Sequence, residues 1–270
     1  MRFPRVSGNR SRSEPLPIAA LAMIGPSRGR FQSTTCTCRV EVKPMNKESI
    51  RIWGLPTRIF HWALAGSFLL AYLSGESERW VKIHVVAGYT LAGLILFRLV
   101  WGFAGTRYAR FKSFWPNPAS VKRHVQGLLR GRAEDEMGHN PIGALAIHAL
   151  LLLGIVTGIS GWLTFEDIGG DWLEEIHEAA ASLMLFIVIL HIAGVLMTSW
   201  LSRQHLVHAM VSGRKMGYPR QAIDSNRPLV AVILLACLMG FWIWSFSQPE
   251  NLMAVMTSTQ SGVNPGDDDD

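Results

Sequence analysis

The sequence predicts an all-α integral membrane protein: a four-helix bundle followed by a fifth membrane helix. Of its 270 residues, 49% are hydrophobic and 17% are charged, and the hydrophobic residues occur in long blocks. A helix needs about 20 mostly apolar residues to cross the hydrocarbon layer. Five stretches approach or meet this length: Ile59–Gly75, Ile83–Gly105, Pro141–Phe165, Ala179–Ser202 and Pro228–Ser247. A soluble protein with buried helices is the alternative, but such helices are usually shorter and amphipathic.

The net charge of +6 is distributed as in a membrane protein, so no nucleic-acid partner is expected. Two connections between the predicted spans are basic: Arg107, Arg110, Lys112, Lys122, Arg123, Arg130 and Arg132 lie in one, and Arg203, Arg214, Lys215, Arg220 and Arg227 in the other. The connection after the third span is acidic instead, with Glu166, Asp167, Asp171, Glu174 and Glu175. Because basic loops tend to stay in the cytoplasm, we expect the N-terminus there and the C-terminus on the opposite side.

Composition divides the chain into four parts. Residues 1–49 form a leader rich in Arg, Ser and Pro, which we expect to be disordered or to precede the natural start at Met45. A signal peptide is the alternative, because arginines precede the apolar run Leu16–Ile24, but no small-residue cleavage site follows. Residues 50–216 form the bundle domain, 217–250 the fifth helix and 251–270 a disordered acidic tail.

Residues 116–131 combine apolar and basic side chains in a helical pattern. Val121, Val125, Leu128 and Leu129 are the apolar positions, and Lys122, Arg123 and Arg130 are the basic ones. This pattern favours an amphipathic helix on an anionic membrane surface, with a solvated loop as the alternative. Residues 203–215 have a similar character.

Four of the nine histidines fall at matched depths in the predicted spans. His61 lies near the cytoplasmic start of the first span, and His84 near the outer start of the second. His177 and His191 share the fourth span, fourteen residues apart, which is about 21 Å along a helix and within about 40° of one face. Because successive spans alternate in direction, depth pairs His84 with His177 and His61 with His191.

Two such imidazole pairs are the arrangement that two haem groups require. A bis-histidine haem iron takes one nitrogen from each side of the porphyrin, and Ala65, Gly88 and Ala181 leave room one turn beyond three of the histidines. A single intramembrane imidazole would more simply hydrogen-bond a neighbouring helix. The chain has no Cys-x-x-Cys-His motif, so any haem is expected to be held without a covalent bond.

Five segments resemble, in order and spacing, the bacterial cytochrome b561 family, and within it the b-type cytochrome subunits of nickel-iron hydrogenases: RIFHWALAG, KIHVVAGYTLAGLILFRLVWGF, GHNPIGAL, EIHEAAASLMLFIVILH and LVHAMVSGRK. The resemblance covers roughly residues 50–216. It implies a four-helix bundle with two haem b groups in the bacterial inner membrane. It also carries the axial-ligand roles onto the same four histidines, His61, His84, His177 and His191.

Further residues are candidates for cofactor contacts. Arg98 lies fourteen residues after His84 on the same helix face, at the level expected for the carboxylates of an inner haem, and an arginine fork suits a carboxylate. Snorkelling of Arg98 to lipid headgroups is the alternative. Arg58 and Lys82 are weaker candidates for the same role. His148 is interpreted as a packing or hydrogen-bonding residue, and His139 with Asn140 as a cap before Pro141.

The expected function is that of an electron-carrier subunit rather than a stand-alone enzyme. It would pass electrons between a periplasmic partner (a nickel-iron hydrogenase, a dehydrogenase or a cytochrome c) and the quinone pool or another membrane acceptor. Membrane lipid is an expected partner, and a homo-oligomer is compatible with the sequence. Two rivals remain: a quinone oxidoreductase with its own catalytic pocket, and a metal permease whose histidines converge on one ion.

Overall fold

The computed structural model describes residues 46–131 and 136–247. Most of the predicted leader and the whole acidic tail lie outside these residues. Five long helices form the main body: α1 (Leu55–Ser74), α2 (Val81–Ala104), α4 (Pro141–Phe165), α5 (Asp171–Ser202) and α7 (Pro228–Ser247). The shorter elements are β1 (Glu48–Arg51), η1 (Glu78–Trp80), η2 (Phe111–Ser113), α3 (Pro118–Leu129), α6 (Leu206–Ser212), β2 (Arg214–Gly217) and η3 (Pro219–Gln221).

All five predicted spans form helices. Three of them begin earlier than expected: α2 by two residues, and α1 and α5 by at least one turn. The helix α5 begins at Asp171 and reaches 32 residues, because Asp171 and Glu174 in its first turn suit the positive end of the helix dipole. The helix α1 begins at Leu55, with a proline in its first turn. Four helical segments are long and apolar enough to cross a membrane: Glu78–Ala104, Pro141–Phe165, Asp171–Ser202 and Pro228–Ser247. The 20-residue α1 is less apolar and is not among them.

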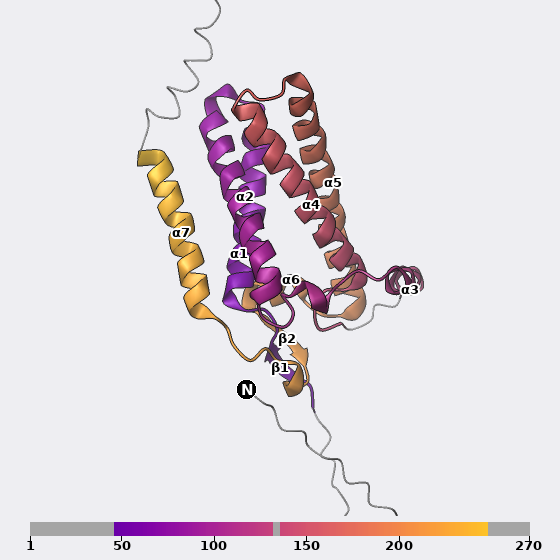
Figure 1. Ribbon diagram of the computed structural model, residues 1–270. Helices are drawn as coiled ribbons and strands as arrows, with labels where there is room; N and C mark the ends of the chain where they lie inside the picture. The colour runs from indigo at the N-terminus through magenta and orange to yellow at the C-terminus, as the bar shows by residue number, and fades with distance from the viewer. Residues whose placement is uncertain (1–45, 132–135, 248–270) are drawn as a thin grey trace, which may run out of the picture. The chain divides into compact units, whose positions relative to one another are not determined.

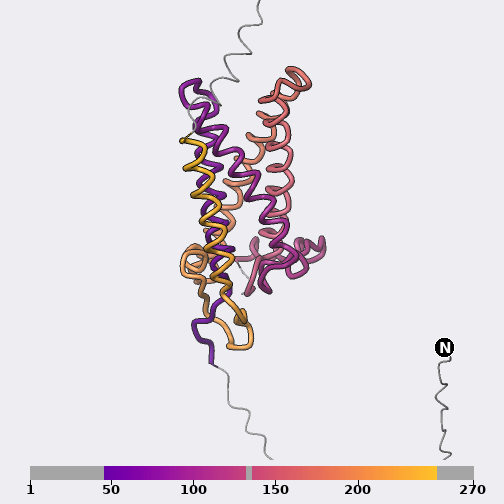
Figure 2. The backbone as a smooth tube through the Cα atoms, turned by 60° about the vertical axis from the view of Figure 1, so that its left-hand side comes forward, coloured from indigo at the N-terminus to yellow at the C-terminus, as the bar shows by residue number. Residues whose placement is uncertain are grey.

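The long helices run alternately up and down (Figures 1 and 2), so that α1 packs along α2, α2 on α4, and α4 along α5. A central apolar cluster joins these four helices: Phe68, Leu91, Ile95, Leu151 and Met184. The fifth helix, α7, packs on α1 and α2. There the Trp242 indole donates a hydrogen bond of 3.0 Å to the Thr90 hydroxyl. The predicted architecture, a four-helix bundle with an added C-terminal helix, is confirmed.

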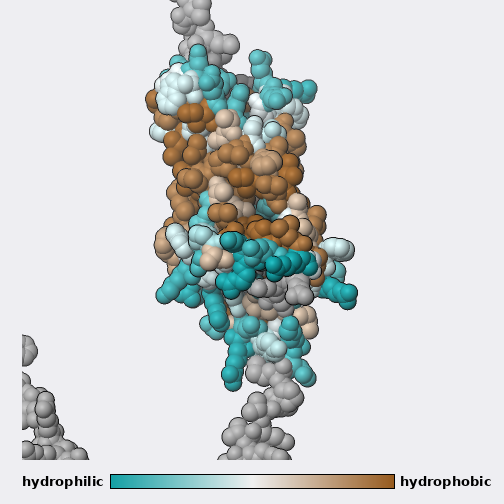
Figure 3. Space-filling model, turned by 90° about the vertical axis from the view of Figure 1, so that its right-hand side faces the viewer, coloured by the Kyte–Doolittle hydropathy of each residue, from teal (hydrophilic) through white to brown (hydrophobic). Residues whose placement is uncertain are grey.

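The outer surface of the bundle is apolar over most of its length. Large hydrophobic side chains such as Leu73 (71% exposed), Leu96 (65%) and Phe103 (77%) face outward. On the face drawn in Figure 3, a hydrophobic belt lies between two hydrophilic ends. Water-soluble monomers rarely expose contiguous apolar patches of this extent, so the surface is that of a protein embedded in lipid.

One end of the bundle carries all the short elements except η1, and is called the strand end below; the turns 75–80 and 166–170 form the far end (Figure 1). The strands β1 and β2 pair antiparallel, with Glu48 opposite Gly217. The backbone N–H groups of Ile52 and Trp53 donate to the Gly213 carbonyl, which extends this contact toward α1. The all-α prediction did not include this small sheet, because each strand has only four residues.

Charge differs between the two ends. The described residues of both basic connections, 105–131 with 136–140 and 203–227, lie at the strand end, whereas the acidic turn after α4 lies at the far end (Figure 1). The sequence predicted that both basic connections and the start of the first span share one side, and the fold confirms this arrangement.

Candidate functional site

His84 and His177 meet at the far end of the bundle. His84 lies in the first turn of α2 and His177 in the second turn of α5. Their ring centroids are 6.0 Å apart, with an interplanar angle of 69°. An imidazole nitrogen binds a transition metal at about 2 Å, which puts two imidazoles on opposite sides of one ion with centroids about 6 Å apart. The spacing of this pair, called the far pair below, therefore fits a shared metal.

Backbone carbonyls of two other helices orient both rings of the far pair. Nδ1 of His84 lies 2.8 Å from the Ala71 carbonyl of α1, and Nδ1 of His177 lies 2.9 Å from the Thr157 carbonyl of α4. Since a carbonyl can only accept, each Nδ1 carries the hydrogen and donates it. This leaves each Nε2 unprotonated and able to bind a metal, as in most histidine metal sites.

Two glycines make room for these rings. A Cβ atom on Gly161 of α4 would lie 2.6 Å from Cε1 and 2.7 Å from Nδ1 of His177, closer than real side chains approach. A Cβ on Gly75 would touch the His84 ring at 3.4 Å. The sequence does not mark Gly161, Thr157 or Ala71 as neighbours of the far pair, because none of them lies close to His84 or His177 along the chain.

We expect Gly161→Ala to displace the His177 ring, because the new methyl group would occupy the space of that ring. The measurement is the visible spectrum and haem content of the purified variant, which should bind less haem if the far pair ligates one. Gly158→Ala is the matched control, since a Cβ there meets only the Ala92 methyl at an ordinary 3.7 Å. Equal haem content in the two variants would contradict this role of Gly161.

The second predicted pair, His61 on α1 and His191 on α5, lies toward the strand end and is called the near pair. The two imidazoles are within electrostatic range of each other. Nδ1 of His61 is buried without a hydrogen-bond partner among the described residues. Space is present beside both pairs, because a Cβ on Gly88, one turn after His84, or on Gly194, three residues after His191, would meet nothing within 4 Å. The residues present therefore fit a planar group next to each pair.

Arg98 is buried, at 5% exposure, rather than extended to the membrane surface. Its guanidinium donates to the Ala109 carbonyl at 2.9 Å and lies 4.8 Å from the centre of the Phe111 ring. The snorkelling alternative for Arg98 is therefore wrong. The other two cations contact protein groups elsewhere: Arg58 donates to the Val211 carbonyl of α6, and the Lys82 ammonium lies 5.1 Å from the Phe246 ring of α7.

Two further histidines lie close to Arg98. The His139 ring packs 4.8 Å from Trp53 and 4.6 Å from Phe114. Burial lowers the pKa of His139 to about 3, and the positive charge of the nearby Arg98 guanidinium acts in the same direction. His139 is therefore a neutral imidazole near neutral pH. The predicted cap before Pro141 is confirmed for Asn140, which accepts from the Gly143 N–H at 2.6 Å, whereas the His139 ring packs on aromatic side chains instead.

His148 packs among aromatic rings, as its interpretation as a packing residue predicted. Its Nδ1 lies 2.8 Å from the Ala144 carbonyl one turn earlier, and its ring lies 5.6 Å from Phe114 and 5.4 Å from Trp115. The Nε2 atom is buried without a partner among the described residues. Among the described residues, Nε2 of His148 is therefore left without a hydrogen-bond partner.

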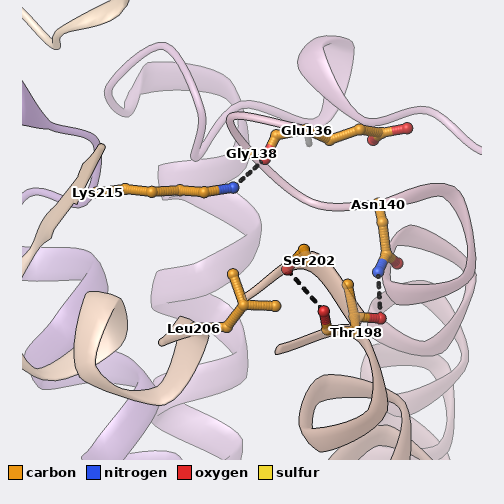
Figure 4. A pocket seen from close by; sticks show the side chains of 7 residues that line it. All are labelled: Glu136, Gly138, Asn140, Thr198, Ser202, Leu206 and Lys215. Carbon is orange, nitrogen blue, oxygen red and sulfur yellow. Dashed lines mark hydrogen bonds between the residues drawn. The ribbon is translucent and has the colours of Figure 1, made fainter. Parts of the chain in front are cut away.

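A small polar pocket opens at the strand end (Figure 4), lined by Glu136, Gly138, Asn140, Thr198, Ser202, Leu206 and Lys215. Lys215 donates to the Glu136 carbonyl, and Ser202 donates to the Thr198 carbonyl at 2.6 Å. None of the predicted site histidines lines this pocket. Among residues 46–131 and 136–247, no group of three or more His, Cys, Asp or Glu could hold a metal ion, so the ligand cluster that a metal permease needs is not found there.

The model of the family described as prokaryotic cytochrome b561 matches residues 52–213. A probable Ni/Fe-hydrogenase B-type cytochrome subunit of Rhizobium leguminosarum bv. viciae is 24% identical over 224 residues, 66% of this chain and 94% of the relative. The corresponding subunit of Escherichia coli (strain K12), for hydrogenase 1, is 27% identical over 154 residues, 47% of this chain and 65% of the relative. No solved structure matches.

The family match covers more than half of the chain, including all four histidines of the far and near pairs. It agrees with the apolar helices of the bundle and with imidazole nitrogens left free to bind a metal. The chain therefore belongs to the prokaryotic cytochrome b561 family, as a multi-pass bacterial membrane cytochrome that binds haem b and takes part in electron transfer.

Proposed function

We propose that the chain binds two haem b groups and carries electrons between the two faces of the membrane. The far pair, His84 and His177, would ligate one haem and the near pair, His61 and His191, the other. The observation that carries this proposal is the 6.0 Å separation of the far-pair rings together with their fixed Nδ1 donors. The two sites are about 21 Å apart along α5, because fourteen residues separate its two histidines.

The two imidazole rings of the far pair would already be oriented before any haem binds. The carbonyls of Ala71 and Thr157 hold the two rings in one tautomer and increase the basicity of each Nε2. The open space at Gly88 admits a flat ring next to His84. When bound, haem supplies a reversible one-electron couple at its iron. The surrounding apolar helices exclude water and so set the potential of that couple.

The near site differs in having charged and neutral polar groups beside it. Haem b carries two carboxylates, and the buried Arg98 guanidinium is suited to bind one of them. His139 and His148, both with a buried ring nitrogen that lacks a partner among the described residues, would donate or accept hydrogen bonds there. Arg58 and Lys82 were proposed for the same role, and their contacts with α6 and Phe246 make them weaker candidates.

The orientation follows from charge. We place the basic strand end in the cytoplasm and the acidic far end in the periplasm, by the positive-inside bias. The far haem would then accept electrons from a periplasmic partner. Relatives named as hydrogenase cytochrome subunits support a Ni/Fe-hydrogenase as that partner, although a dehydrogenase or a cytochrome c would use the same face.

The proposed acceptor is the quinone pool. A quinone reaches the protein from the lipid. Trp115, which is 71% exposed, lies 5.4 Å from the half-buried His148 ring near the strand end. This contact supports a quinone approaching the near haem. Residues 50–216 would form the electron-transfer domain, with α7 as an added helix.

Transmembrane transfer can be tested in liposomes that contain the haem-loaded protein and an enclosed oxidant. A reductant that cannot cross the bilayer is added outside, and the enclosed oxidant should be consumed much faster than in liposomes without protein. If the outside reductant reduces part of the haem but the enclosed oxidant is never consumed, the protein does not carry electrons across the membrane and the proposal is wrong. Steady turnover of quinol with a soluble acceptor, without any partner protein, would favour the rival quinone oxidoreductase.

A further inference from the structure

The helix α3 stands apart from the bundle. It begins after Asn117, whose side chain accepts from the Ala119 N–H at 3.0 Å, and among the long helices it packs mainly on α4. Figure 1 shows it nearly end-on, so its axis lies across the direction of the bundle helices. His124 is 4% exposed and is the only buried residue of α3. One side of α3 therefore faces the protein, whereas Lys122, Arg123, Val125, Gln126, Leu129 and Arg130 on its other sides are exposed.

The free part of α3 is divided into an apolar and a basic face. Val125 is 38% exposed and Leu129 is 83% exposed. With about 100° per residue, these two side chains share one face, about 100° or more around the helix from His124. By the same rotation Lys122 lies about 160° from His124, next to the apolar face. Arg123 and Arg130 lie about 100–120° from His124 in the other direction and form the basic face. All three cations are exposed.

This helix lies at the edge of the hydrophobic belt. In Figure 3, which looks at the side of the molecule that bears α3, a hydrophilic row runs directly beneath the belt. Trp115, 71% exposed, precedes α3, and tryptophan prefers this interfacial level of a membrane. An apolar face toward the acyl chains and cations at the phosphate level are the two features of a helix that lies on a membrane.

We propose that α3 binds the headgroups of anionic phospholipids, with Lys122, Arg123 and Arg130 as phosphate ligands and Val125 and Leu129 inserted among the acyl chains. The positive charge of residues 105–132, which contain no Asp or Glu, favours an anionic lipid over a protein or a neutral lipid as the ligand. Basic residues near a membrane surface each add to the attraction for anionic lipid. The proposal does not depend on haem or on which end faces the cytoplasm.

The test counts bound lipid on the full-length protein in detergent by native mass spectrometry, during titration with phosphatidylglycerol or phosphatidylcholine. Wild-type protein should retain phosphatidylglycerol preferentially, and the preference should weaken with salt. The variant K122Q/R123Q/R130Q should bind phosphatidylglycerol at least about tenfold more weakly. The matched control R51Q/R214Q/R220Q removes the same charge from exposed positions of the β1–η3 region and should bind as wild type does.

Two further measurements make the result decisive. The haem spectrum of each variant reports whether it is folded, and a folded triple variant with unchanged phosphatidylglycerol binding would overturn the proposal. Equal loss in the α3 variant and the control would also overturn it, since the attraction would then be a property of net charge alone. Inorganic phosphate at equal concentration should not compete; if it displaces the lipid, α3 is a free-phosphate site instead and the lipid proposal is wrong.

Discussion

The variants His84→Ala and His177→Ala should each be purified with one haem per chain instead of two. Removing either imidazole takes away one axial ligand of the proposed far haem and leaves its partner, held by Ala71 or Thr157, facing an empty side. The near pair is about 21 Å away along α5 and should keep its haem. Haem content is measured as the pyridine adduct and compared with protein concentration.

His208→Ala is the control for these variants. His208 is exposed in α6 at the strand end, so its removal should leave both haems in place. Two haems per chain in both His84→Ala and His177→Ala would mean that these imidazoles do not ligate iron, and the far-pair assignment would have to be abandoned.

The variants His61→Ala and His191→Ala should have the opposite phenotype, losing the near haem and keeping the far one. Electrons delivered at the far end would then reduce the remaining haem and go no further. In the liposome assay, consumption of the enclosed oxidant should fall to the rate of protein-free liposomes, while the outside reductant still reduces the remaining haem. This is the largest functional effect that we expect from any single substitution.

A comparison between the two sets of variants separates ligand loss from general damage. Their optical difference spectra should be complementary, so that the two single-haem spectra add up to that of the wild type. If His61→Ala and His177→Ala lose the same spectral component, the depth pairing would be refuted even though both residues bind iron.

The helices and the depth of the histidines could be predicted from the sequence because both depend on local properties. Block lengths of apolar residues gave the spans, and the alternation of spans fixed which end each histidine occupies. The fourteen-residue separation of His177 and His191 determines their relative face on α5 wherever that helix lies. The contact between His84 and His177 at 6.0 Å therefore lies where depth alone predicted it.

The surroundings of the histidines could not be predicted in the same way. The contact of Gly161 with the His177 ring, and the carbonyls of Ala71 and Thr157, depend on how each helix is rotated about its axis. Periodicity in a membrane helix gives little information about rotation when lipid and core faces are equally apolar. Burial of His139 beside Trp53 depends on the β1–β2 pairing, which joins residues far apart in the chain.

The most direct measurement is electron paramagnetic resonance of the oxidised wild-type protein, with haem and protein quantified in the same sample. If each haem iron is bound by two imidazoles, the spectrum should contain two low-spin ferric signals and no more than a trace of high-spin signal. The same sample should contain two haems per polypeptide. A single haem per polypeptide, or a dominant high-spin signal from iron with an open axial position, would contradict the paired-histidine arrangement.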